Sequence, residues 1–217
     1  MSVDLSIYLV TEPDPRRRQG RALVETVAAA VAGGVTVVQL RDKDVDDNAM
    51  LQLVEALSRS LPGHVPLLIN DRVDVFVEAK ARGLRVAGVH VGQDDLPVEQ
   101  VRARIGPDAV LGLTANTEAE LAGAAASAIR IDYVGIGVVR TTASKPDAPP
   151  PLGVAGVVRL AGGCPLPAVA IGGIEPTDLA PLRAGGLAGA AVVSWICAAD
   201  DPRAAAVNLA EAWQAAA

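Results

Sequence analysis

The sequence predicts an α/β fold, and within that class a (β/α)8 barrel that takes up the whole chain, residues 1–217, as a single domain. Short apolar segments rich in β-branched residues alternate eight times with longer Ala-rich segments of helical pattern, separated by Gly, Pro and Asp. Hydrophobic residues make up 51% of the chain but aromatic residues only 2%, as is typical of parallel strands and their covering helices. Eight strand–helix pairs in 217 residues fit a compact barrel.

Each predicted strand is a short apolar segment bounded by turn residues. Their regular spacing leaves room for one helix after each strand, as parallel strands require. The expected strands are Ser6–Val10, Val35–Arg41, Pro66–Asn70, Gly88–Val91, Val110–Thr114, Tyr133–Val138, Ala168–Ile171 and Gly189–Val193.

Several of the predicted helices carry their own boundary signals. Asp46 can cap the second helix, Pro97 has the first-turn position of the fourth, and Arg82-Gly83 marks the end of the third. The expected helices are Gln19–Ala32, Asp46–Leu61, Val73–Ala81, Pro97–Ile105, Thr117–Ala128, Val154–Leu160, Thr177–Ala184 and Pro202–Ala216.

An open doubly wound sheet is the alternative to a barrel. No Gly-x-Gly-x-x-Gly follows the first predicted strand, so dinucleotide binding has no support. One long polar loop, Thr141–Pro151, follows the sixth strand, where mobility over a site is expected.

Composition excludes several classes of function. The formal net charge of −6 makes broad nucleic-acid binding unfavourable, although local cationic clusters can still bind a small anion. Cys164 and Cys197 are too few for a disulfide framework or a zinc site, which suits a reducing compartment. The N-terminus has no signal-peptide pattern and no apolar run is long enough to cross a membrane, so we expect a soluble, cytoplasmic protein without a membrane partner.

Polar residues gather at the predicted strand ends, which in a barrel meet at the mouth where such enzymes place their chemistry. If Val35–Asp44 is extended, Gln39, Arg41 and Lys43 point to one face. The nearby aspartates leave a solvated loop as the alternative for Arg41 and Lys43. The other strand-end candidates are Asn70, Asp71, Asp95, Thr114, Thr142, Ser144, Lys145, Gly172, Gly173 and Ser194.

Asp71 and Asp95 follow adjacent strands. Together they could hold a hard divalent cation such as Mg²⁺, which takes one or two carboxylates and leaves other positions to water and phosphate. Each could instead cap the helix that follows it.

The Gly172-Gly173 pair and the Ala191–Ser194 segment follow the seventh and eighth strands. Loops at these positions form the usual phosphate site of the barrel, and glycine lets an anion approach the backbone. A tight turn is the simpler interpretation of the glycine pair. His90, inside a strand pattern, is interpreted as a structural histidine in preference to a catalytic one.

Five ordered segments, VVQLRDK, LINDRVDV, GVHVGQDDLP, DYVGIGVVRTTASK and PAVAIGGI, resemble the thiamine-phosphate synthase family over nearly the whole chain. The resemblance implies a (β/α)8 barrel and a Mg²⁺-dependent transferase. It would join hydroxymethylpyrimidine pyrophosphate to a thiazole phosphate, or its carboxylated form, to give thiamine phosphate and pyrophosphate. The oligomeric state is left open by the sequence, although members of the family often form homodimers.

The resemblance implies a role for each matched residue. Those that would hold the pyrimidine pyrophosphate are Gln39, Arg41, Lys43, Asn70, Thr114, Thr142, Ser144 and Lys145, with Arg41, Lys43 and Lys145 stabilising the leaving group. Asp71 and Asp95 would ligate Mg²⁺. Gly173, Val193 and Ser194 would bind the thiazole phosphate.

The chain departs from the family pattern after the fifth and sixth strands. Val138, Val139, Arg140 and Thr141 replace a proline, an aliphatic residue, an aromatic residue and a second proline, and Asn116 replaces a histidine. Arg140 adds a cation beside the expected site. Two other functions are alternatives: a related thiazole tautomerase, whose expected base is a histidine at the position of Val138, and a non-catalytic barrel that binds a thiamine precursor.

Overall fold

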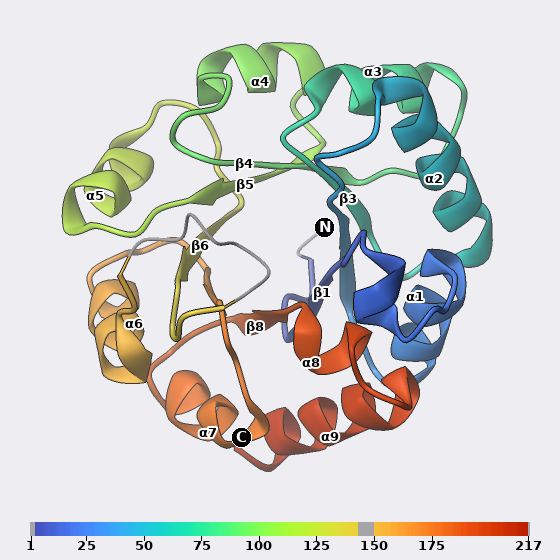
Figure 1. The fold of residues 1–217 in the computed structure, drawn as a ribbon. Helices are drawn as coiled ribbons and strands as arrows, with labels where there is room; N and C mark the ends of the chain where they lie inside the picture. The colour runs from blue at the N-terminus through green and yellow to red at the C-terminus, as the bar shows by residue number, and fades with distance from the viewer. Residues whose placement is uncertain (1–2, 143–149, 217) are drawn as a thin grey trace.

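The computed structural model describes residues 3–142 and 150–216 and forms a closed barrel of eight parallel strands in sequence order (Figure 1). The barrel prediction is therefore confirmed. The strands are β1 (Ile7–Val10), β2 (Val37–Leu40), β3 (Leu67–Asn70), β4 (Gly88–Val91), β5 (Val110–Thr114), β6 (Tyr133–Gly137), β7 (Ala168–Ile171) and β8 (Gly189–Val192).

Helices surround the strands as an outer ring, and the short helix α8 lies inside that ring near the end of β8 (Figure 1). The helices are η1 (Pro15–Arg18), α1 (Leu23–Ala32), α2 (Asp47–Ser60), α3 (Val73–Ala81), α4 (Val98–Ile105), α5 (Glu118–Ala126), α6 (Gly153–Gly162), α7 (Pro176–Ala184), α8 (Ser194–Cys197) and α9 (Pro202–Ala215).

The strands divide their side chains between two cores, as alternation along a strand requires. In β1, Ile7 and Leu9 pack outward into the large core shared with the helices. Tyr8 and Val10 point inward to a smaller cluster that fills the barrel interior. Because both faces are buried, the strands are largely apolar, and polar residues such as Gln39, Asn70 and Thr114 lie toward their C-terminal ends.

Local signals set most of the helix boundaries. The Asp46 side chain accepts a hydrogen bond from the Ala49 N–H at 2.8 Å, which confirms the predicted cap of α2. At α5, Thr117 and Glu120 form a reciprocal capping box.

Most element ends lie within two residues of the prediction, and three differences concern the start of α1, helix α8 and the end of β2. Asp14 caps the 3₁₀ helix η1 and Gln19 ends it with a left-handed φ of 55°, so α1 begins only at Leu23. Helix α8 was not predicted. Strand β2 ends at Leu40, and the backbone then bends at residues 43–45, where the Asp44 N–H donates to the Asp42 carboxylate.

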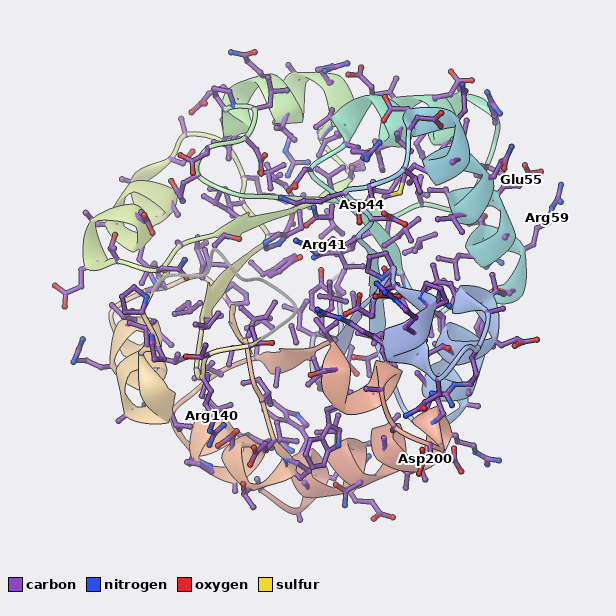
Figure 2. All side chains as sticks on the ribbon, in the orientation of Figure 1. Arg41, Asp44, Glu55, Arg59, Arg140 and Asp200 are labelled. Atoms are coloured by element: carbon purple, nitrogen blue, oxygen red, sulfur yellow. The ribbon has the colours of Figure 1, made fainter. Side chains whose placement is uncertain are left out.

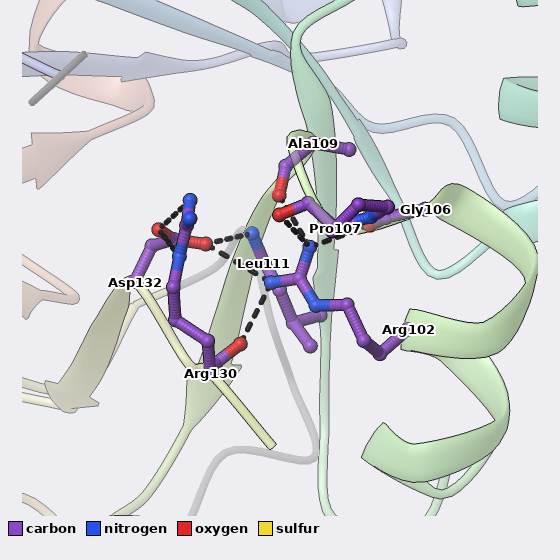
Figure 3. Close-up of polar contacts among 7 residues, drawn as sticks. All are labelled: Arg102, Gly106, Pro107, Ala109, Leu111, Arg130 and Asp132. Carbon is purple, nitrogen blue, oxygen red and sulfur yellow. Dashed lines mark hydrogen bonds and ion pairs between the residues drawn. The ribbon is translucent and has the colours of Figure 1, made fainter.

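An arginine and an aspartate join elements at the N-terminal end of the barrel (Figure 3). Arg102 of α4 donates to the carbonyls of Ala109 at 2.6 Å and Arg130 at 2.7 Å, and it pairs with Asp132 at 3.2 Å. Asp132 also accepts from the Leu111 N–H at 2.8 Å. The pair fixes α4, β5 and β6 at the end opposite the strand-end candidates.

Among the helices of residues 3–142 and 150–216, none combines the length and the apolar character needed to cross a membrane.

Candidate active site

A pocket opens at the C-terminal ends of the strands and contains about 1310 Å³ of space free of protein atoms, part of it open to solvent. Figure 2 labels Arg41 near the centre of the barrel. Ser144 and Lys145 lie outside the described residues. The pocket is lined by the other predicted site residues: Gln39, Arg41, Lys43, Asn70, Asp71, Asp95, Thr114, Thr142, Gly172, Gly173, Val193 and Ser194.

The cationic side of the pocket comes from the segment after β2. The Arg41 N–H donates to the Thr11 hydroxyl oxygen at 2.9 Å, and this hydroxyl donates to the Arg41 carbonyl at 3.1 Å, so the Arg41 backbone is fixed against β1. Lys43 lines the pocket too, although β2 ends at Leu40 and the backbone bends from residue 43 onward. The strand is therefore shorter than predicted, while Gln39, Arg41 and Lys43 line one pocket as expected.

The two carboxylates do not act as helix caps. The N-cap residues of α3 and α4 are Arg72 and Pro97, and neither makes a side-chain capping bond. Asp71 has a φ of 58°, and Asp95 accepts a hydrogen bond from the Gly92 N–H at 2.7 Å. The capping alternative is therefore wrong for both residues.

The surroundings of Asp71 disfavour the ionised form of its carboxyl group. Its pKa is raised to about 6: burial is the largest cause, the neighbouring Asp95 carboxylate adds to it, and Lys43, with Nζ 3.5 Å from Asp71 Oδ2, opposes both. A second carboxylate beside Asp71 suits a divalent cation, which would offset the repulsion that Asp71 experiences.

The side chains available as metal ligands indicate which cation the site would suit. Among the described residues, no group of three or more His, Cys, Asp or Glu side chains could hold a metal ion. Two carboxylates beside Lys43 match Mg²⁺, which keeps several waters and binds substrate phosphates, better than a metal that requires a full protein cage.

The loop after β7 lies on the other side of the pocket. Gly172 and Gly173 have φ values of 91° and 66°, which favour glycine. A Cβ on Gly172 would lie 2.5 Å from the Val138 Cβ, and one on Gly173 would lie 2.7 Å from the Arg140 Cβ. Both glycines are thus required by backbone conformation and by close approach, and they lie beside Ser194 in the pocket wall.

A chain of hydrogen bonds crosses the base of the pocket, and sequence reasoning missed most of it. Gln39 Nε2 donates to the Tyr8 hydroxyl at 2.7 Å, which lies 2.7 Å from the Tyr133 hydroxyl. His90 connects Tyr133, at 2.9 Å from Nδ1, with the Thr114 hydroxyl, at 2.9 Å from Nε2. The available signal was that both tyrosines of the chain occupy predicted strands.

These buried groups are polar but not readily ionised. Burial raises the pKa of Tyr8 and that of Tyr133 well above the usual value, so both phenols stay protonated near neutral pH. His90 is hydrogen-bonded through both ring nitrogens, as expected of a structural histidine, and it also lines the pocket.

The residues that depart from the family pattern also have defined places. Asn116 accepts a hydrogen bond from the Gly137 N–H at 2.9 Å, and Val138 lines the pocket over Gly172. The Arg140 guanidinium pairs with Asp178.

Comparison with known proteins agrees with this architecture. The family model described as thiamine monophosphate synthase matches residues 7–196. A thiamine-phosphate synthase of Xanthobacter autotrophicus is 46% identical over 204 residues, covering 94% of this chain and 92% of the relative. One from a Psychrobacter species is 45% identical over 203 residues, covering 93% and 92%.

A solved structure is similar over almost its whole length. The thiamine phosphate pyrophosphorylase of Pyrococcus furiosus superposes with a TM-score of 0.82 at 28% identity, covering 98% of this chain and 97% of that one. Family model, sequence relatives and structural neighbour all span the barrel and the pocket residues. The chain therefore belongs to the thiamine-phosphate synthase family.

Proposed function

We propose that this chain condenses 4-amino-2-methyl-5-hydroxymethylpyrimidine pyrophosphate with 4-methyl-5-(2-phosphoethyl)thiazole, or its carboxylated form, in the presence of Mg²⁺. The products are thiamine phosphate and pyrophosphate. One observation carries the proposal: Arg41, Lys43 and the Asp71–Asp95 pair line the pocket after β2 to β4, and the glycine loop lines it after β7. Two groups of residues that would bind phosphates, from separate loops around one pocket, match a reaction between two phosphorylated substrates.

The bond changes define what the pocket must do. The C–O bond between the pyrimidine methylene and the pyrophosphate breaks with its electron pair going to the leaving oxygen, and the thiazole nitrogen forms the new C–N bond. The main requirement is to stabilise the departing polyanion. Arg41 and Lys43 supply positive charge there, as Lys145 would.

When bound, Mg²⁺ would supply further positive charge to the pyrophosphate oxygens. Asp71 and Asp95 are the residues that would hold it, and the raised pKa of Asp71 supports that assignment because a cation would relieve its repulsion with Asp95.

The remaining residues would bind and orient the substrates. Gln39 and Asn70 would hold the pyrimidine pyrophosphate together with Thr114, Thr142 and Ser144. Gly173, Val193 and Ser194 would bind the phosphate of the thiazole, since the loops after β7 and β8 form the usual phosphate site of this fold. The reaction needs no protein nucleophile.

A two-product turnover assay tests this function. Purified protein is given both substrates with and without Mg²⁺, and thiamine phosphate and pyrophosphate are followed together. Mg²⁺-dependent release of both in equal amounts is expected. Release of neither, while thiazole phosphate still binds, would overturn the synthase assignment and favour a precursor-binding barrel.

The tautomerase alternative has little support, because Val138 offers no acid–base group at the position where the base of that enzyme is expected.

A further inference from the structure

Arg140 and Asp178 form an ion pair between the loop after β6 and the first turn of α7 (Figure 2 labels Arg140). Arg140 Nη1 lies 2.5 Å from Asp178 Oδ2, and Nη2 lies 2.7 Å from Oδ1. This two-bond geometry is directional, because the planar guanidinium matches both carboxylate oxygens. The side chain of Asp178 is only 5% exposed and that of Arg140 is 43% exposed.

The same arginine holds both glycines of the loop after β7. Its backbone N–H donates to the Gly172 carbonyl at 2.9 Å, and Nη1 donates to the Gly173 carbonyl at 2.9 Å. Its Cβ would lie 2.7 Å from a Cβ built on Gly173. Arg140 thus supports Gly172-Gly173 through a main-chain bond, a side-chain bond and a close contact.

Asp178 fixes the other end of this loop. Its Oδ2 accepts a hydrogen bond from the Glu175 N–H at 2.8 Å, as part of the capping box of α7. The segment from Gly172 to Glu175 is therefore held at its start by Arg140 and at its end by Asp178, and the two holding residues are bonded to each other.

Arg140 and Asp178 compensate each other's charge. Burial would raise the pKa of Asp178, but the hydrogen bonds from Arg140 and from the Glu175 N–H outweigh burial and hold the pKa below its usual value. Asp178 is therefore ionised near neutral pH and compensates the charge of Arg140, and Glu175 adds a further negative charge nearby. Arg140 is thus better suited to placing the loop than to supplying an uncompensated cation to a substrate.

We propose that Arg140 and Asp178 are a positioning pair that sets the affinity for the thiazole phosphate by fixing Gly173 at the edge of the pocket. The inference rests on the proposed function for the identity of the ligand. It assigns a role to a residue at which this chain departs from the family pattern, and to a buried aspartate that lies outside the pocket wall.

The test separates geometry from charge. Arg140→Gln and Asp178→Asn each remove the two-bond pair, and each should raise the KM and the Kd for the thiazole phosphate about tenfold, with KM for the pyrimidine pyrophosphate within about twofold of wild type. Arg140→Lys keeps the charge but cannot form the planar pair, so it should behave like Arg140→Gln. The double variant should be no worse than Arg140→Gln alone, because Asp178→Asn removes an ion pair that Arg140→Gln already removes.

Arg102→Gln is the matched control. Arg102 pairs with Asp132 and binds backbone carbonyls in a similar way, but at the opposite end of the barrel (Figure 3). This variant should lower the melting temperature at least as much as Arg140→Gln and leave both KM values within about twofold of wild type.

Two results would overturn the positioning role. One is an Arg140→Lys variant that binds thiazole phosphate like wild type, since charge alone would then suffice. The other is a set of Arg140 and Asp178 variants that lose stability without losing thiazole phosphate affinity, as Arg102→Gln does.

Calorimetry with thiazole phosphate alone keeps this test independent of turnover. If the wild-type protein binds thiazole phosphate but shows no turnover, the proposed function is refuted, and the affinities of the variants can still be compared. If the wild-type protein turns over and the variants bind thiazole phosphate as tightly as it does, only the positioning role is refuted.

Discussion

The hydroxyl groups of Tyr8 and Tyr133 lie 2.7 Å apart at the base of the pocket, although β1 and β6 are not neighbours in the barrel. Each phenol has a second partner, Gln39 for Tyr8 and His90 for Tyr133. The contact therefore joins residues from opposite sides of the barrel into one hydrogen-bonded chain, which ends at Gln39 and Thr114 in the substrate pocket.

Tyr133→Phe tests this chain. It leaves the Tyr8 hydroxyl and His90 Nδ1 without their common partner in a buried site, so the free energy of unfolding should fall by about 1–3 kcal/mol. KM for the pyrimidine pyrophosphate should rise severalfold, because both ends of the chain line the pocket. Denaturant unfolding and steady-state kinetics measure the two effects.

Thr26→Val is the control for lost buried hydrogen bonding. Thr26 is fully buried in α1, and its hydroxyl donates to the Ala22 carbonyl away from the pocket. It should destabilise the protein without changing KM. Equal KM values in Tyr133→Phe and wild type would show that the chain does not orient the pocket residues.

Gly173→Ala tests the phosphate loop. The substitution combines a left-handed φ of 66° with a Cβ 2.7 Å from that of Arg140, so the loop must shift. We expect a loss of about 1–2 kcal/mol in stability and a rise of at least tenfold in KM for the thiazole phosphate.

Gly83→Ala isolates the backbone contribution to that result. Gly83 has a φ of 73°, but a Cβ there would meet nothing within 4 Å. The Gly83→Ala variant should lose a similar amount of stability through backbone strain and leave both KM values unchanged. A Gly173→Ala variant with the same behaviour would argue against phosphate binding at this loop.

The fold was predictable because its signals are local. Apolar strands, capped helices and turn glycines gave all eight strands, and β4, β5 and β7 have the predicted bounds. The errors fall at a 3₁₀ helix and at a very short α-helix. Gln19 was assigned to a helix that starts at Leu23, and the four-residue helix α8 is too short for periodicity to reveal.

The site was predictable where polar side chains follow strands, because the barrel brings those ends together. It was not predictable where function depends on a partner from another element. The Tyr8–Tyr133 contact depends on inward register, and Arg140 was expected to add a cation beside the site, whereas the structure pairs it with Asp178. Pair contacts between residues distant in sequence leave no local pattern.

Asp95→Asn tests the metal assignment. Asparagine keeps an acceptor for the Gly92 N–H but removes one of the two charges that would hold Mg²⁺. Turnover at fixed Mg²⁺ should fall about 10²-fold or more, with partial recovery as Mg²⁺ is raised. Asp94→Asn, next to it but outside the pocket wall, should retain wild-type turnover and Mg²⁺ dependence. Near-normal activity of Asp95→Asn at low Mg²⁺ would exclude Asp95 as a ligand.

The pKa of Asp71 makes the stability of the metal-free protein depend on pH. Burial and Asp95 raise this pKa from 3.8 to about 6 in the folded protein, so the folded state binds a proton more tightly than the unfolded state does. The associated stability is present below pH 3.8 and is lost as pH rises through about 6. Asp71→Asn should therefore stabilise the metal-free protein by about 1–2 kcal/mol at pH 8, after allowance for solvent screening at the open pocket, by about half as much at pH 5, and by little near pH 3.

In the wild type, Mg²⁺ should counteract this loss of stability at high pH. It binds the ionised carboxylate, so the rise in melting temperature on adding Mg²⁺ should be larger at pH 8 than at pH 5. Asp71→Asn should lose most of this rise at both pH values. Thermal melts of both proteins, with Mg²⁺ or with chelator, give the four comparisons. An equal Mg²⁺ effect at pH 5 and pH 8 in the wild type, or an undiminished one in Asp71→Asn, would remove Asp71 from the metal site.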